Sequence, residues 1–92
     1  MITVGRKIRY LRQQHHMTQN ELGQALGFSQ STADVRIAQY ESGARAPKAQ
    51  LLRRIALVLE VDPIILRVDI PETEEEWRAI RYWIHQLSSN HQ

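Results

Sequence analysis

Apolar residues recur along the chain at the spacing of three to four that places them on one side of a helix. The first such run, Val4, Ile8 and Leu11, predicts a helix over residues 4–15 with Thr3 as its N-cap. Three cations lie among these positions, and we expect them to be solvated rather than buried. They are Arg6, Lys7 and Arg9.

Thr18 and Glu21 mark the start of a second, shorter helix, predicted over residues 19–26. They stand three residues apart, so the Thr hydroxyl can accept from the Glu amide while the Glu carboxylate accepts from the Thr amide. This capping box fixes where the helix begins. Leu22 starts its apolar side, and Gly27 can adopt the left-handed backbone conformation that ends a helix.

A third helix is predicted over residues 32–42, after a polar turn. Thr32 is its candidate N-cap, and Gly43 is the residue expected to end it. Ile37 and Tyr40 stand three residues apart and would face the core. Two short helices joined by a turn form the device that places a helix in the DNA major groove.

Two further helices are predicted before residue 67. Pro47 precedes a helix over residues 48–60, and Asp62 caps a short one over residues 63–66. Their apolar positions are expected to be buried. These positions are Leu51, Leu52, Ile55, Ala56 and Leu59 in the first helix and Ile64, Ile65 and Leu66 in the second. The fold class is therefore expected to be all-α, with a five-helix bundle over residues 1–67.

Residues 68–92 are predicted to form a linker followed by a sixth helix. Thr73 and Glu76 make a second capping box at its start, with acids in the first turn. Apolar residues then follow at the spacing of a seam between helices. They are Trp77, Ile80, Ile84 and Leu87, with Trp83 beside them. Such a helix must cover something, so it either folds back on its own domain or pairs with the same helix of a second chain.

Composition narrows the class of protein. The chain has 92 residues, 42% of them hydrophobic and 24% charged, which suits one soluble globular domain. The absence of cysteine excludes disulfides and thiolate metal sites, and no metal or other cofactor is expected. No apolar run is long enough for export or for crossing a bilayer, so we expect a cytoplasmic protein with no membrane partner.

The net charge of +2 conceals an uneven distribution. Residues 1–54 carry nine Lys or Arg against three acids, a net +6, whereas residues 55–92 carry three Arg against seven acids, a net −4. A basic first half can neutralise phosphates, and an acidic second half would be repelled by them. A mixed solvated surface is the alternative, but the basic half coincides with the helices around the polar turn, which favours a nucleic-acid partner.

Several short motifs stand in one order around that turn. They are Thr18-Gln19-x-Glu21-Leu22-Gly23, Gly27-Phe28-Ser29, Tyr40-Glu41-x-Gly43 and Pro47. Together they resemble the helix-turn-helix domain of Cro and lambda-type repressors, the Xre-like regulators, over roughly residues 4–66. The turn is about four residues longer than the commonest pattern of that family. The resemblance implies a sequence-specific transcriptional regulator that binds double-stranded DNA, with repression as its expected effect and a homodimer as its expected form.

The third predicted helix carries the candidate base-reading residues, Val35, Arg36 and Gln39. Arg36 and Gln39 are three residues apart, so both can reach base edges, where Arg suits guanine and Gln suits adenine. Val35 could touch a thymine methyl group. Candidate contacts to the DNA backbone come from the start of the second helix and from the loop after the third. They are Thr18, Gln19, Ser42, Arg45 and Lys48.

The resemblance also implies a structural ion pair between Arg12 and Glu41, which would hold the first helix against the third. A second interpretation of the chain is a protein-interaction module, antitoxin-like or an adaptor, that works through the C-terminal helix. Its anchors would be Trp77, Tyr82 and Trp83. An enzyme is the least favoured class, because there is no glycine-rich phosphate loop, spaced metal-ligand set or cysteine nucleophile. No small-molecule substrate is inferred.

Overall fold

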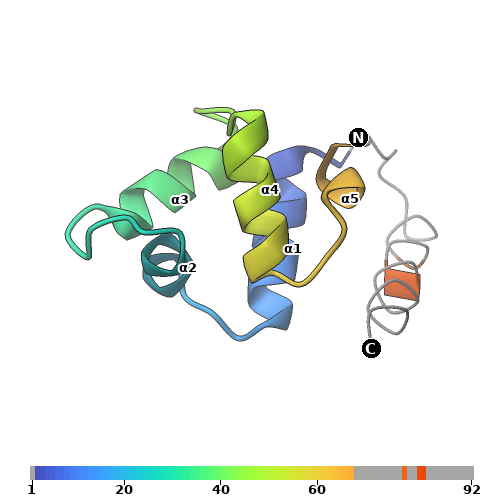
Figure 1. Ribbon diagram of the computed structural model, residues 1–92, viewed down its shortest axis with the longest axis horizontal. Coiled ribbons are helices and arrows are strands. Elements are labelled where there is room, and N and C mark those ends of the chain that lie inside the picture. The colour runs from blue at the N-terminus through green and yellow to red at the C-terminus, as the bar shows by residue number, and fades with distance from the viewer. Residues whose placement is uncertain (1, 68–77, 79–80, 83–92) are drawn as a thin grey trace.

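The computed structural model describes residues 2–67, 78, 81 and 82, and its first 67 residues contain five helices (Figure 1). Helix α1 spans Val4–Gln14 and begins as expected at Thr3, whose hydroxyl accepts a hydrogen bond of 3.2 Å from the backbone N–H of Arg6. It ends one residue earlier than the sequence predicts, at a C-cap formed by His15. Ile8 and Leu11 are buried, as expected.

Helix α2 spans Gln19–Ala25 and starts at the predicted capping box. The hydroxyl of Thr18 accepts from the backbone N–H of Glu21, and the Glu21 carboxylate accepts from the backbone N–H of Thr18, both over 3.0 Å. These hydrogen bonds satisfy two donors that a helix start would otherwise leave unpaired. After α2 the chain passes through Gly27, whose φ of +91° is the left-handed conformation expected there.

Helix α3 spans Ala33–Ser42 and is ended by Gly43, whose φ is +84°. Thr32 occupies the N-cap position, but its side chain makes no capping hydrogen bond and lies 3.0 Å from the hydroxyl of Ser29 instead. The turn between α2 and α3 is closed by a backbone hydrogen bond of 2.9 Å from Ala33 N–H to Ser29 O. The longer turn therefore has hydrogen bonds of its own.

Helices α4, Ala49–Val58, and α5, Pro63–Arg67, complete the bundle. Helix α4 begins one residue after its predicted start, because Lys48 serves as the N-cap. Asp62 caps the start of α5 as expected, accepting from the backbone N–H of Ile64 over 3.0 Å. The prediction that Ile64 is buried is wrong: its side chain is 57% exposed, since only one side of this short helix faces the core.

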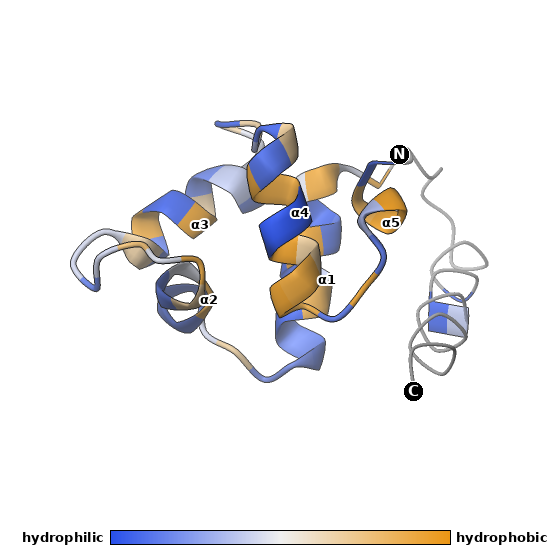
Figure 2. Cartoon of the chain, in the orientation of Figure 1, coloured by the Kyte–Doolittle hydropathy of each residue, from blue (hydrophilic) through white to orange (hydrophobic). Residues whose placement is uncertain are grey.

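The core lies where α1, α2 and α3 meet α4 and α5, and apolar residues from each helix supply it. Figure 2 shows that the helices carry both hydrophobic and hydrophilic residues, as the amphipathic pattern predicts. Burying each large aliphatic side chain contributes about 1.5–3 kcal/mol to stability. The buried core residues are Ile8, Leu11, Leu22, Leu26, Ile37, Tyr40, Ile55, Ala56, Leu59, Val61, Ile65 and Leu66.

Two glycines permit the close approach of helices to α3. A Cβ added to Gly23 of α2 would stand 2.5 Å from the Cβ of Ala33, and one added to Gly5 of α1 would stand 2.4 Å from the carbonyl oxygen of Tyr40. Both distances are shorter than any tolerable contact, so a larger residue at either position would push α3 away. The position of α3 therefore depends on these two residues.

The expectation that Lys7 is solvated is wrong, because its exposure is only 1%. Lys7 stands three residues after Val4 and four before Leu11, which is the spacing of the buried side of α1. Helix α1 contacts both α3 and α5, so its covered surface is wider than the strictly apolar positions. The position of Lys7 on the buried side of α1 therefore determines its burial, despite the charge of its side chain.

Of the predicted helix after residue 67, the structure describes only Arg78, Arg81 and Tyr82, which are helical and exposed. The candidates for dimerisation all lie outside the described residues: Trp77, Ile80, Trp83, Ile84 and Leu87. Among the residues that the structure describes, no helix has the length and apolar character needed to span a membrane.

Candidate nucleic-acid interface

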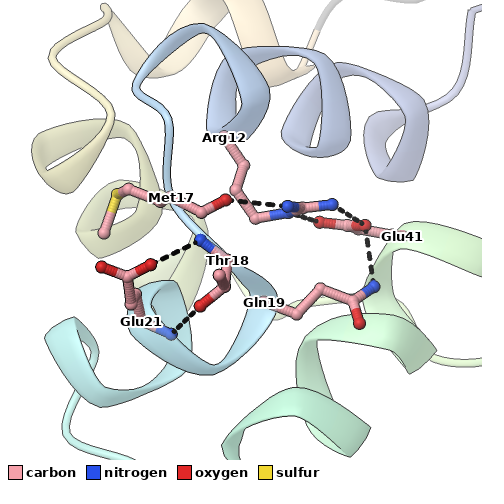
Figure 3. A network of polar contacts seen from close by, with 6 residues as sticks. All are labelled: Arg12, Met17, Thr18, Gln19, Glu21 and Glu41. Carbon is pink, nitrogen blue, oxygen red and sulfur yellow. Dashed lines mark hydrogen bonds and ion pairs between the residues drawn. The ribbon is translucent and has the colours of Figure 1, made fainter.

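Arg12 of α1 and Glu41 of α3 form a two-point ion pair (Figure 3). The Arg12 Nε donates to Glu41 Oε2 over 2.7 Å, and its Nη2 donates to Glu41 Oε1 over 3.1 Å. The third nitrogen, Nη1, donates to the carbonyl oxygen of Met17 over 2.8 Å. The two side chains are only 11% and 5% exposed, so water screens this pair weakly. The contact fixes α3 against α1 and against the start of α2.

Gln19 joins the same carboxylate from the first turn of α2. Its Nε2 donates to Glu41 Oε1 over 3.1 Å, so α1, α2 and α3 all meet at Glu41 (Figure 3). One hydrogen of this amide group remains for another acceptor. Thr18, beside it, is exposed at the start of α2. The sequence-based assignment of both residues to the DNA backbone stays a prediction.

Thr18, the N-cap of α2, also changes the pKa of the Glu21 carboxyl. The hydrogen bond from the Thr18 backbone N–H, and secondly the Thr18 side chain, lower the pKa of the Glu21 carboxyl below its ordinary value. These groups favour the ionised carboxylate, which is also the form that the positive end of the helix dipole favours. The start of α2 therefore carries a negative charge, the Glu21 carboxylate, that hydrogen bonds hold in place.

Two sides of α3 differ in what they present to solvent. Val35 is 55% exposed, and Gln39, four residues later on the same side, is half-buried. Arg36 and Tyr40 form the neighbouring side, and both line a hollow that opens toward the start of α4. The three residues predicted to read bases are thus divided between two sides of the helix.

The Arg36 side chain is held by two aromatic residues. Its guanidinium carbon lies 3.7 Å from the centre of the Phe28 ring, a cation–π contact, and its Nη2 lies 3.5 Å from the Tyr40 hydroxyl. The Arg36 Nε is buried and has no hydrogen-bond acceptor among the residues that the structure describes. The sequence analysis missed Phe28 as a contact of Arg36, because the two residues lie on opposite sides of the turn and no helical spacing relates them.

The hollow beside Arg36 has a volume of about 600 Å³ and is open to solvent. It lies between α3, the loop that follows and α4, and four of its lining residues are cations. The lining consists of Phe28, Arg36, Tyr40, Arg45, Ala46, Lys48, Gln50, Leu51 and Arg54. No acidic residue is among them. We call this hollow the basic hollow.

The loop after α3 brings two of these cations next to the helix. Arg45 donates its backbone N–H to the carbonyl oxygen of Gln39 over 3.1 Å, which folds the loop back on α3. The hydroxyl of Ser42 accepts from the backbone N–H of Ala44 over 3.3 Å. Arg45 and Lys48 are exposed, in keeping with their proposed contacts to phosphate. Arg54 of α4 reaches the hollow from the other side and donates to the carbonyl oxygen of Leu26, at the end of α2.

The comparisons with known proteins agree with this arrangement of helices. A family model described as helix-turn-helix matches residues 8–66, about two thirds of the chain. No curated protein and no solved structure matches the chain. The matched residues begin in α1 and end in α5, so they include α2, α3 and the turn between them. The chain therefore belongs to the Cro/C1-type, Xre-like helix-turn-helix family of DNA-binding regulators.

Proposed function

We propose that this protein binds specific sequences of double-stranded DNA and regulates transcription by placing α3 in the major groove. The observation that carries the proposal is the side of α3 on which Val35 is exposed and Gln39 half-buried, next to a loop that presents Arg45 and Lys48. A helix side free of core contacts can enter the groove, while adjacent cations meet the phosphates that border it.

The base-reading roles follow from side-chain chemistry. Gln39 can donate to and accept from adenine, and Val35 can pack on a thymine methyl group. Arg36 suits guanine, but its guanidinium lies over the Phe28 ring and lines the basic hollow. Val35 and Gln39 are therefore the better supported readers, and reading by Arg36 stays a prediction.

Contacts to the backbone are proposed at both ends of the α2–α3 unit. Thr18 and Gln19 lie at the start of α2, where the helix dipole favours an anion. Ser42, Arg45 and Lys48 lie at or after the end of α3, where the small residues of the loop let a phosphate approach. These contacts would set affinity and register, whereas Val35 and Gln39 would set sequence preference.

We further propose that the protein acts as a homodimer and as a repressor. Residues 68–92 would supply part of the contact between chains, as their apolar spacing indicates. Exposed Leu57 of α4 and Ile64 of α5 add apolar surface that a second chain would cover. Sedimentation equilibrium on the full chain and on Trp83→Ala tests this: a dimer that becomes a monomer in the variant supports it, and a monomeric wild-type chain contradicts it.

Selection of bound sequences from random duplexes, followed by fluorescence anisotropy, tests sequence-specific binding. We expect Gln39→Ala to lose about 1–3 kcal/mol of discrimination at one base pair and Lys48→Ala to weaken binding to all duplexes alike. Arg53→Gln is the control for a lost cation, since Arg53 is exposed on α4 and does not line the basic hollow. Equal affinity of the wild-type protein for selected and scrambled duplexes would contradict the proposal.

A further inference from the structure

The basic hollow brings together four cations from α3, the loop after it and α4. Arg36 comes from α3, Arg45 from the loop, Lys48 from the N-cap of α4 and Arg54 from within α4. A hollow of about 600 Å³ is about as wide as the screening distance in 0.1 M salt, about 10 Å. The four cations therefore act together on whatever enters, and an anion there is attracted by all of them.

These cations are not neutralised within the part of the chain that the structure describes. The lining contains no carboxylate: of the two acids on α3, Glu41 is occupied by Arg12 and Gln19, and Asp34 does not line the hollow. The buried Nε of Arg36 has no acceptor. An anionic oxygen that reaches this guanidinium from the hollow would therefore meet a charge that no carboxylate of the lining offsets, and would bind favourably.

Phe28 and Tyr40 keep Arg36 at the hollow. The Phe28 ring lies against the guanidinium, and the Tyr40 hydroxyl lies 3.5 Å from its Nη2. A guanidinium fixed in this way loses little conformational freedom when it binds a phosphate, which suits its planar set of donors. On the neighbouring side of α3, Val35 remains exposed and Gln39 half-buried.

We propose that the basic hollow is a phosphoryl-binding site that takes one backbone phosphate of bound DNA, with Arg36 as a phosphate ligand rather than a base reader and Phe28 as its positioning residue. The inference rests on the proposed function, because it requires a duplex along α3. A duplex is favoured as the source of the phosphate because the hollow adjoins the exposed side of α3. It is also much wider than one phosphate group, so a stretch of sugar–phosphate backbone fits it.

The test is a thermodynamic cycle between single residues and single phosphates. Duplexes of the selected sequence carry one neutral methylphosphonate at successive positions, and binding is measured by anisotropy with wild-type protein and Arg36→Gln. We expect one position at which neutralisation weakens wild-type binding by about tenfold and leaves Arg36→Gln nearly unaffected. Base-pair substitutions should weaken both proteins by the same factor.

Two variants separate this role from a loss of fold. Arg53→Gln removes a cation from an exposed position of α4 outside the hollow, and should keep the full tenfold effect. Phe28→Leu keeps an apolar side chain and removes the ring, and should shrink the effect at the same phosphate while leaving base preference unchanged. Circular dichroism confirms that each variant is folded before its binding is compared.

Several outcomes would overturn the assignment. One is coupling of Arg36 to a base pair instead of a phosphate, which would restore it as a reader. Another is the absence of any phosphate whose effect depends on Arg36. A third is saturable binding of inorganic phosphate at the Arg36 Nε–H, followed by NMR at constant ionic strength, without any coupling to DNA. In each case wild-type binding to the selected duplex still supports the proposed function, whose own failure would appear as no sequence preference at all.

Discussion

Charged groups lie on two sides of α3, and only one side is neutralised among the described residues. On one side Glu41 accepts from Arg12 and Gln19 and is almost completely covered. On the other, Arg36 lies over Phe28 among cations with no acid in the same lining. The Glu41 side therefore carries charge that holds α3 in place, and the Arg36 side carries charge that remains available to a ligand. Mutation of the first kind should lower the free energy of unfolding. Mutation of the second kind should weaken DNA binding and leave stability nearly unchanged.

The largest expected effect is on the neutralised side. Replacing Glu41 with Ala leaves the Arg12 guanidinium nearly buried without its partner, and we expect the free energy of unfolding to fall by about 3–5 kcal/mol. Urea denaturation followed by circular dichroism measures it. Asp34→Ala removes the same charge from an exposed position on α3 and should change stability by less than about 1 kcal/mol. Equal losses in the two variants would contradict the comparison.

A smaller effect is expected at the contact between α1 and the end of α3. Gly5→Ala introduces a Cβ that would meet the Tyr40 carbonyl oxygen at 2.4 Å, so the helices must separate. We expect a loss of about 1–3 kcal/mol in thermal or urea unfolding. Gln13→Ala, at an exposed position of α1, serves as the control and should lie within about 0.5 kcal/mol of wild type.

The capping box of α2 should contribute less again. Thr18→Ala removes the acceptor of the Glu21 N–H and should cost about 1 kcal/mol. The lowered pKa of Glu21 also predicts a pH dependence: its contribution is present above the unfolded-state value near 4.5 and is lost as the pH falls through the lower folded-state value. Glu21→Gln should reduce the dependence of the unfolding free energy on pH in that acidic range. An unchanged pH dependence would exclude this role of Glu21.

The smallest effects on stability are expected around the basic hollow. Arg45→Ala and Lys48→Ala remove cations without a carboxylate partner in its lining, so stability should stay within about 0.5 kcal/mol of wild type. DNA binding should respond instead, with the slope of log affinity against log salt reduced by about 1 for each lost phosphate contact. A large loss of stability in either variant would show that these cations hold the fold together.

Features set by neighbouring residues were predictable from the sequence. The Thr18–Glu21 capping box, the Thr3 cap and the left-handed Gly27 and Gly43 each depend on a few consecutive positions, and the structure confirms all of them. Their geometry needs no knowledge of the rest of the chain. The family and the all-α fold class followed from the order of these same signals, and both are shown.

Features set by distant partners were predictable only where the family resemblance supplied the partner, as it did for Arg12 and Glu41. Lys7 is buried on a helix that both α3 and α5 contact, and Arg36 lies over Phe28 because the turn brings the ring back to α3. The basic hollow needs α4 as its second wall, so no spacing within α3 could reveal it. Side-chain periodicity predicts which side of a helix is buried. Tertiary packing determines how many positions around the helix that buried side includes.

The meeting of α1 and α2 at the Glu41 carboxylate has a consequence for the timing of recognition. Because Arg12 and Gln19 already donate to the Glu41 carboxylate, α3 keeps its orientation in the free protein. Little ordering is then required when DNA binds. The association rate should then depend on electrostatic encounter and slow as salt rises. Different DNA sequences would be told apart chiefly by how long the protein stays on each of them.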